Sequence, residues 1–207
     1  MLFRSSEARQ ASLKALQRLN RLGFTDVGAL AQLSRLRVLC VDVRKIEDLT
    51  DVGRLSQLRG LAFVTGGPGA PARLRSLAPL ARLTSLRHLS LGHVRLADPR
   101  LDPLTMLTRL RRLDISNRFP REEFAKLAAA LPRTEGPYRS PFFTDSLLAP
   151  LLTCRKCGVR TKLTTLGKPA RWMCPGCDAA KMRRFVADWE ILVSSTRVHV
   201  ARRGAGR

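Results

Sequence analysis

Aromatic residues and long apolar runs are both scarce in this chain of 207 residues. Phe, Trp and Tyr together make up 5% of the sequence although 44% of it is hydrophobic, so a packed core has to be built from aliphatic side chains. No uncharged apolar run approaches the roughly 18 residues that a membrane-spanning helix needs. The first residues also lack an apolar stretch of signal-peptide length. We therefore expect no transmembrane segment and a cytoplasmic protein.

Familiar catalytic motifs are missing as well. The sequence contains no Walker A lysine loop, no G-x-S-x-G, no H-E-x-x-H and no G-x-G-x-x-G. The glycine-rich segment 66–70 lacks the lysine that a phosphate-binding loop requires. We therefore expect a binding protein and not an enzyme.

Negative charge is also in short supply. Lys and Arg number 38 against 16 Asp and Glu, which gives a formal net charge of +22. Residues 1–135 contribute 24 − 12 = +12 and residues 136–207 contribute 14 − 4 = +10. The shorter C-terminal part therefore carries more positive charge per residue. Such an excess favours anionic partners such as nucleic acid, acidic proteins or anionic membrane surfaces. A bias in coding composition would give the same excess, because arginine and alanine are both abundant.

Leucine is present in an internal repeat. The pattern L-x-x-L-x-(apolar) occurs at 36–41, 58–63, 86–91 and 110–115, with starts 22, 28 and 24 residues apart. Between these segments apolar residues lie three apart, as in Leu49, Val52 and Leu55, which predicts a tight 3₁₀-like or helical return. Over about residues 22–120 the chain resembles the leucine-rich-repeat family, in its bacterial form with 22-residue units. The resemblance implies an α/β fold, a solenoid whose strands form a short parallel sheet.

The expected concave face of the solenoid carries the candidate partner-binding residues. The position after each first leucine is an arginine, and outward strand positions on the last two strands add a histidine, an arginine and an aspartate. Basic residues at this position can bind the carboxylates of an acidic protein partner, or they can simply be solvated. The position at which the family usually has a buried asparagine holds Arg44, Val94 and Arg118. The candidate partner-binding residues are Arg37, Arg59, Arg87, Arg111, His88, Arg112 and Asp114.

Four of the five cysteines form two C-x-x-C pairs near the C-terminus. Cys154 and Cys157 are followed, 16 residues later, by Cys174 and Cys177. This spacing is typical of a structural Zn²⁺ site, because two tight turns can each present two thiolates to one ion. With four sulfur ligands the ion has no open position for water, so we predict a structural zinc ion.

The residues around these cysteines resemble a zinc ribbon, with a β-hairpin over 159–173 that turns at 167–169. A helix is predicted from residue 179 to 190, and a helix starting at the second cysteine pair would instead resemble a treble clef. A short strand at 191–193 or 198–200 is expected to follow. Cations and one tryptophan surround the site and support an alternative function, nucleic-acid binding. These residues are Arg155, Lys156, Arg160, Lys162, Arg171, Trp172, Arg183 and Arg184.

The predicted organisation has five parts. An N-terminal cap with an amphipathic helix precedes the solenoid, which ends in a capping helix at 120–131. A linker that also packs against both neighbours joins the solenoid to the small zinc module, which resembles a zinc ribbon or treble clef, and a basic tail ends the chain. The predicted boundaries are 1–23, 24–133, 134–150, 151–193 and 194–207.

Overall fold

The computed structural model describes residues 35–42, 47–64, 72–92, 94–143, 153–160 and 163–204. The predicted N-terminal cap (1–23) and the first return segment lie outside these residues. Within them, the chain forms a parallel sheet, a row of short helical turns, a second small parallel sheet, and a C-terminal part with a three-stranded antiparallel sheet and a long helix.

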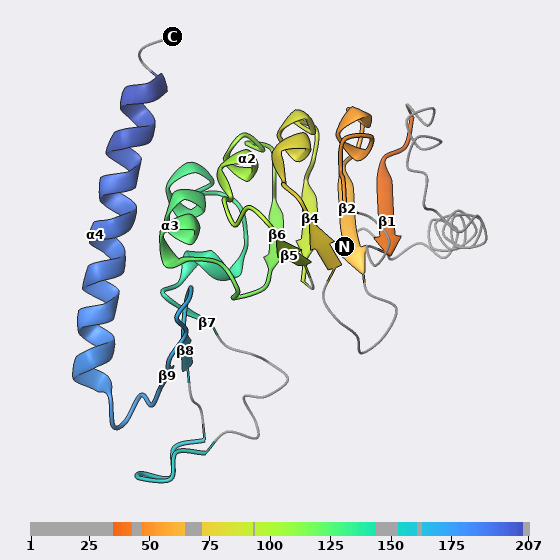
Figure 1. Ribbon diagram of the computed structural model, residues 1–207. Coiled ribbons are helices and arrows are strands. Elements are labelled where there is room, and N and C mark those ends of the chain that lie inside the picture. The colour runs from red at the N-terminus through yellow and green to blue at the C-terminus, as the bar shows by residue number, and fades with distance from the viewer. Residues whose placement is uncertain are drawn as a thin grey trace.

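The L-x-x-L-x-(apolar) segments form the parallel strands that the repeat predicted. The strands pair in the order β1-β2-β4-β6 and lie side by side in Figure 1. Leu39, Leu61, Leu89 and Leu113 are partners in register, and each is at most 2% exposed. Stacking therefore merges the leucines of successive repeats into one core. The strand bounds are Val38–Asp42 for β1, Gly60–Val64 for β2, His88–Leu91 for β4 and Arg112–Ile115 for β6.

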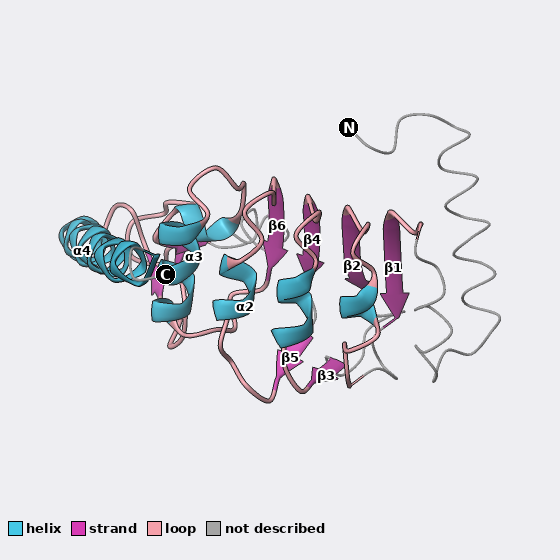
Figure 2. Cartoon of the chain, turned by 90° about the horizontal axis from the view of Figure 1, so that it is seen from above, coloured by secondary structure: helices cyan, strands magenta, loops and turns pink. Residues whose placement is uncertain are grey.

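The predicted tight returns are also confirmed. Figure 2 shows them as a second row beside the strands, formed by η3 (Val52–Arg54), η4 (Ala78–Arg82) and α2 (Asp102–Thr105). Their apolar residues recur every third position, and the backbone bonds repeat with the same period: Leu83 N–H donates to the carbonyl of Leu80 at 2.9 Å. Since a 3₁₀ turn places residues three apart on one side, every one of these apolar side chains is buried.

The strands β3 (Ala72–Leu74) and β5 (Val94–Leu96) form a second parallel pair. Along the chain, β3 lies between β2 and η4, and β5 lies between β4 and α2. Val94 occupies one of the positions where the repeat family usually has asparagine, and it is 1% exposed. An aliphatic side chain thus replaces a buried polar one at this position.

The capping helix is α3 (Arg121–Ala130), which covers the last repeat. Its Glu123 is 8% exposed and accepts a 2.6 Å bond from the backbone N–H of Leu101 and a 2.8 Å bond from Lys126. A buried carboxylate is tolerated because both of its oxygens are paired. Glu123 thereby connects α3 to the start of α2.

The segment predicted as a linker (134–150) is packed where it is described. Glu135 continues the parallel pairing beside Arg112, and Tyr138 in η5 (Pro137–Arg139) is fully buried. Phe142 and Phe143 form β7, which pairs with β8 of the hairpin. Phe143 also packs against the core, as expected for a segment between the two parts of the chain.

The C-terminal part contains the predicted hairpin, β8 (Leu163–Thr165) and β9 (Trp172–Met173), which are antiparallel. The helix that follows is longer than predicted: α4 spans Ala179–Gly204. The strand expected at 191–193 or 198–200 was wrong, because these residues continue a helix that packs along α3. The boundary at 193/194 consequently falls inside α4. Among the described helices, none combines the length and the apolarity needed to cross a bilayer.

Candidate metal centre and interaction surface

The four cysteines of the two C-x-x-C pairs meet at one point. Their sulfur atoms all lie within 4.8 Å of one another. Cys154 Sγ is 3.8 Å from Cys177 Sγ, and Cys157 Sγ is 3.4 Å from Cys174 Sγ. A disulfide would bring two sulfurs to about 2.05 Å, whereas a tetrahedron with metal–sulfur bonds of about 2.3 Å has edges of roughly 3.8 Å. The sulfur positions therefore fit a metal ion and not disulfides.

The first cysteine pair lies on a tight turn. Gly158 N–H donates to the carbonyl of Cys154 at 2.9 Å, and Cys154 N–H donates to the carbonyl of Val159 at 2.8 Å. Gly158 has φ +73°, a left-handed conformation that glycine adopts without strain. The backbone N–H groups of Cys157 and Lys156 bond to the sulfur of Cys154 and lower its pKa to about 6. One thiolate is thus stabilised by the turn itself.

Asp178 organises the second pair. Its N–H donates to the carbonyl of Cys174 at 2.8 Å, and its Oδ2 accepts the N–H of Cys174 at 2.9 Å. This second bond is the first cause of the lowered pKa of Asp178, with Lys181 contributing at 3.4 Å. α4 begins directly afterwards, at Ala179. A helix that starts at the second pair is the arrangement of the treble-clef alternative.

The sulfurs cannot all ionise easily by themselves. The thiol of Cys177 hydrogen-bonds to the sulfurs of Cys157 and Cys154. These bonds stabilise the protonated thiol and raise the pKa of Cys177 to about 12. A divalent cation removes this penalty, because it neutralises two of the four negative charges. The donor set consequently fits a thiophilic divalent ion.

The hairpin next to this centre is inserted into the end of the repeats. Leu166, at its turn, is 1% exposed and belongs to the same buried cluster as the repeat leucines. Its N–H donates to the carbonyl of Pro141 at 2.8 Å, and Lys168 N–H donates to the carbonyl of Phe119 at 2.9 Å. Gly167 comes so close to α3 that an added Cβ would lie 2.5 Å from Cα of Arg121. The cysteine-bearing part and the repeats therefore share one core.

Asn117 fixes the hairpin from the side of the repeats. Its Nδ2 donates to the carbonyl of Thr165 at 2.9 Å, and its Oδ1 accepts the N–H of Gly167 at 2.6 Å. Sequence reasoning missed this residue, because it considered the neighbouring position 118 for a buried asparagine. Nothing in the local pattern marks a partner about 50 positions away.

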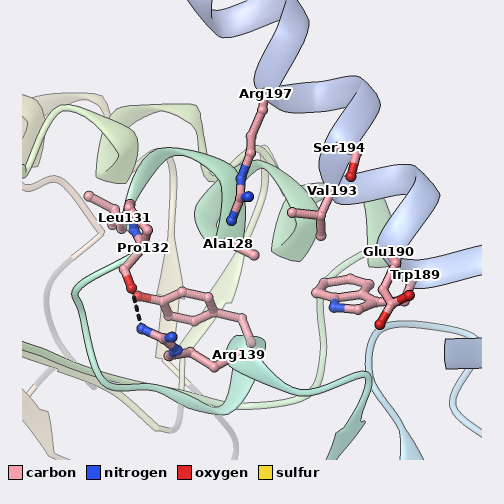
Figure 3. A pocket seen from close by; sticks show the side chains of 10 residues that line it. Ala128, Leu131, Pro132, Arg139, Trp189, Glu190, Val193, Ser194 and Arg197 are labelled. Carbon is pink, nitrogen blue, oxygen red and sulfur yellow. Dashed lines mark hydrogen bonds between the residues drawn. The ribbon is translucent and has the colours of Figure 1, made fainter. Parts of the chain in front are cut away.

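α4 completes the junction by packing on α3. Trp189 and Val193 on its inner side are 5% and 8% exposed. Figure 3 shows a pocket of about 220 Å³ beside them, between the two helices and η5, with Arg197 of α4 reaching into it. Arg139 on the opposite wall donates to the carbonyl of Pro132.

The four arginines after the first leucines stand in one row, here called the arginine ladder: Arg37, Arg59, Arg87 and Arg111. Backbone bonds of 2.7–2.8 Å connect each arginine N–H with the carbonyl of the preceding one. Arg87 is half-buried and the other three are exposed. In the described part of the chain, none of the four guanidinium groups has an ion-pair partner. The ladder ends at Glu135, whose backbone N–H donates to the carbonyl of Arg111 at 2.8 Å.

The outward strand positions form columns as expected. Val38, Gly60, His88 and Arg112 are register partners across the sheet. Burial is the largest cause of the lowered pKa of His88, and nearby positive charges, which include those of Arg111, Arg112 and Arg87, lower it further.

In the neighbouring column, Ser90 donates to Asp114 at 3.0 Å, and both side chains lie at the surface. Arg112 Nε also lies 3.8 Å from Glu135 Oε2, and the two side chains are 70% and 77% exposed. These polar contacts are solvent-accessible, so a partner can compete for them.

The residues of the nucleic-acid alternative lie near the cysteines but are spread over both turns, the hairpin and α4. Trp172 on β9 is 50% exposed. Lys162 lies outside the described residues. The exposed cations of this group are Arg155, Lys156, Arg160, Arg171, Arg183 and Arg184.

Comparison with known proteins finds similar chains among the solved structures. No protein-family model matches the chain, and a search of curated proteins finds no match either. Among solved structures, an internalin (inlF) from Listeria monocytogenes aligns with a TM-score of 0.44 and 25% identity, over 54% of this chain and 30% of that one.

An internalin C2 (inlC2) from the same organism gives a TM-score of 0.44 and 26% identity over 55% of this chain and 46% of that one. A leucine-rich-repeat protein of Leptospira interrogans gives 0.39 and 24%, over 52% of this chain and 26% of that one. The chain thus spans less than half the length of each of these proteins.

Proposed function

We propose that this chain is a non-enzymatic binding protein, a leucine-rich-repeat solenoid that binds another protein through the concave face of its sheet. The observation that carries the proposal is the register of the strands, which lines up outward side chains into columns on a face that the return segments leave uncovered. Repeats that stack in one direction create extended surfaces of this kind. The ladder beside the columns favours an acidic partner, because its cations lack partners in the described chain.

The cysteine centre has a structural role in this proposal. Four thiolates fill the coordination sphere of a tetrahedral Zn²⁺ ion, and thiolate ligands select zinc over magnesium or calcium. The ion would hold both turns together and thereby support the hairpin whose Leu166 enters the repeat core. Metal analysis of protein purified under reducing conditions tests this role: one zinc per chain is expected, and a metal-free, fully folded protein would contradict it.

Site-specific photo-crosslinking tests the binding face. A crosslinking residue replaces Val38, which is 48% exposed on the sheet, or Arg82, which is exposed on the return turn η4. The proposal expects protein crosslinks from position 38 that position 82 does not give. Equal or absent crosslinking from both positions would contradict a sheet-face interface.

A second candidate function is nucleic-acid binding by the cysteine-bearing part. It is favoured by the half-exposed indole of Trp172 beside exposed Arg171, since bases stack on aromatic rings while cations contact phosphates. Binding should then fall steeply with salt. Reversing the charges of Arg155, Lys156, Arg183 and Arg184 should abolish it; absence of RNA or DNA binding at low salt excludes this function.

A further inference from the structure

The four cations of the arginine ladder have no acid within ion-pair distance in the described chain, a property that they share with most other described arginines; what distinguishes them is their regular row. Arg54, Arg75, Arg100 and Arg112 each have an aspartate or glutamate within 4.0 Å. The ladder has no such neighbour in the described chain, although the sequence places 16 acidic residues elsewhere. No described residue therefore competes with an external anion for these four cations.

Its spacing is fixed by the backbone and not by the side chains. Because each arginine N–H bonds directly to the carbonyl of the preceding arginine, the rungs are separated by one strand spacing. Adjacent strands lie about 4.8 Å apart, so the second, third and fourth rungs lie at about 4.8, 9.6 and 14.4 Å from the first. Glu135 occupies the next rung and ends the row with the opposite charge.

Few peptide conformations repeat a side chain at this distance. In an α-helix, residues i, i+3, i+7 and i+10 lie on one side and rise by about 4.5, 10.5 and 15 Å. An extended strand presents every second residue to one side, about 6.8 Å apart. A polyproline helix returns to the same side after about 9.3 Å. Only the α-helical spacing stays within about 1 Å of the rungs.

We infer that the partner presents an acidic α-helix, which lies across the strands with carboxylates at i, i+3, i+7 and i+10 on the arginine ladder. This deepens the proposed function and rests on it. Each guanidinium receives one carboxylate. The adjoining column offers the exposed Val38 to apolar residues on the same helix.

The test uses two fluorescent peptides of identical composition, both stapled as helices. One carries four glutamates at i, i+3, i+7 and i+10, and the other at i, i+4, i+8 and i+12, which drifts about 3.6 Å out of step by the fourth rung. A single-stranded oligonucleotide of the same net charge is the third probe. Anisotropy at low salt should show the first peptide binding the full-length protein about fourfold more tightly than the second.

Two protein variants separate the ladder from general charge. One changes the four ladder arginines to glutamate, and it should weaken the first peptide at least about tenfold. The matched control changes four exposed arginines on other elements to glutamate and should change binding little. The control residues are Arg73, Arg82, Arg95 and Arg109.

Three outcomes overturn the inference. Equal affinity of the two peptides refutes the helical register, and equal losses in both variants refute the ladder as the site. Tighter, ladder-dependent binding of the oligonucleotide would make nucleic acid the ligand class. If position 38 gives crosslinks but neither peptide binds, the sheet-face interface is supported and the acidic helix is refuted as its partner. If position 38 gives no crosslinks, the proposed function itself is refuted.

Discussion

The junction between the repeats and the cysteine centre makes a sharp prediction at Leu166. This leucine lies at the hairpin turn, yet it is 1% exposed and belongs to the core of the repeats. Changing Leu166→Ala removes buried methyl groups from that core without touching a sulfur ligand. Leu163, on the same hairpin, is only half-buried and lies outside the buried cluster, so Leu163→Ala is a matched control with the same chemistry.

The expected cost follows from burial. A fully buried Leu→Ala substitution typically destabilises a protein by about 2 to 5 kcal/mol, because the transfer free energy is lost and a cavity remains. Leu166 should reach this range, since the hydrogen bonds to Pro141 and Phe119 hold the turn in place and limit collapse around the cavity. Leu163→Ala should cost below about 1 kcal/mol.

Urea unfolding of the metal-loaded proteins measures both free energies of unfolding. Circular dichroism follows the helices, and in a Trp172→Phe background the fluorescence of the buried Trp189 follows the packing of α4 on α3. Metal content should be unchanged in both variants, which separates a packing defect from loss of the ion. Equal costs for Leu166→Ala and Leu163→Ala would refute the conclusion that the two parts share a core.

Three further predictions concern the centre, the capping helix and the sheet face. Cys174→Ser should abolish metal binding and expose the hairpin to rapid amide exchange, while the repeat strands keep most of their protection; unchanged metal content would contradict the four-sulfur site. Glu123→Ala should cost about 1 to 3 kcal/mol of stability in urea, because it leaves a buried backbone N–H unpaired, whereas the neighbouring exposed Glu122→Ala should change stability by less than about 0.5 kcal/mol. Arg111→Gln should raise the pKa of His88 in an NMR titration, because removing a nearby cation favours the protonated imidazole; an unchanged pKa would show that the charge of Arg111 does not act on this histidine.

Much of the repeat architecture is readable from the chain. The L-x-x-L-x-(apolar) segments form the strands, and the apolar residues three apart form short 3₁₀ or α-helical returns. Local periodicity decides which side of a strand or turn each residue faces. The four metal-ligand candidates follow from spacing alone, because two residues between cysteines are enough to bring two sulfurs to one point. The start of α4 after the second pair was also within reach, although its end was not.

The tertiary structure decided what distant residues do for one another. Residues 191–193 stay helical because Leu192 and Val193 of α4 pack against the core, and this packing overrides the strand preference of the β-branched residues there. Asn117 and Leu166 acquire their roles only when the hairpin meets the end of the repeats, about 50 positions along the chain. Likewise, the sequence supplied four arginines at equivalent positions, but only the parallel pairing set them one strand apart and showed them without acidic neighbours in the described chain. Such contacts depend on separation in space and leave no periodic trace in the sequence.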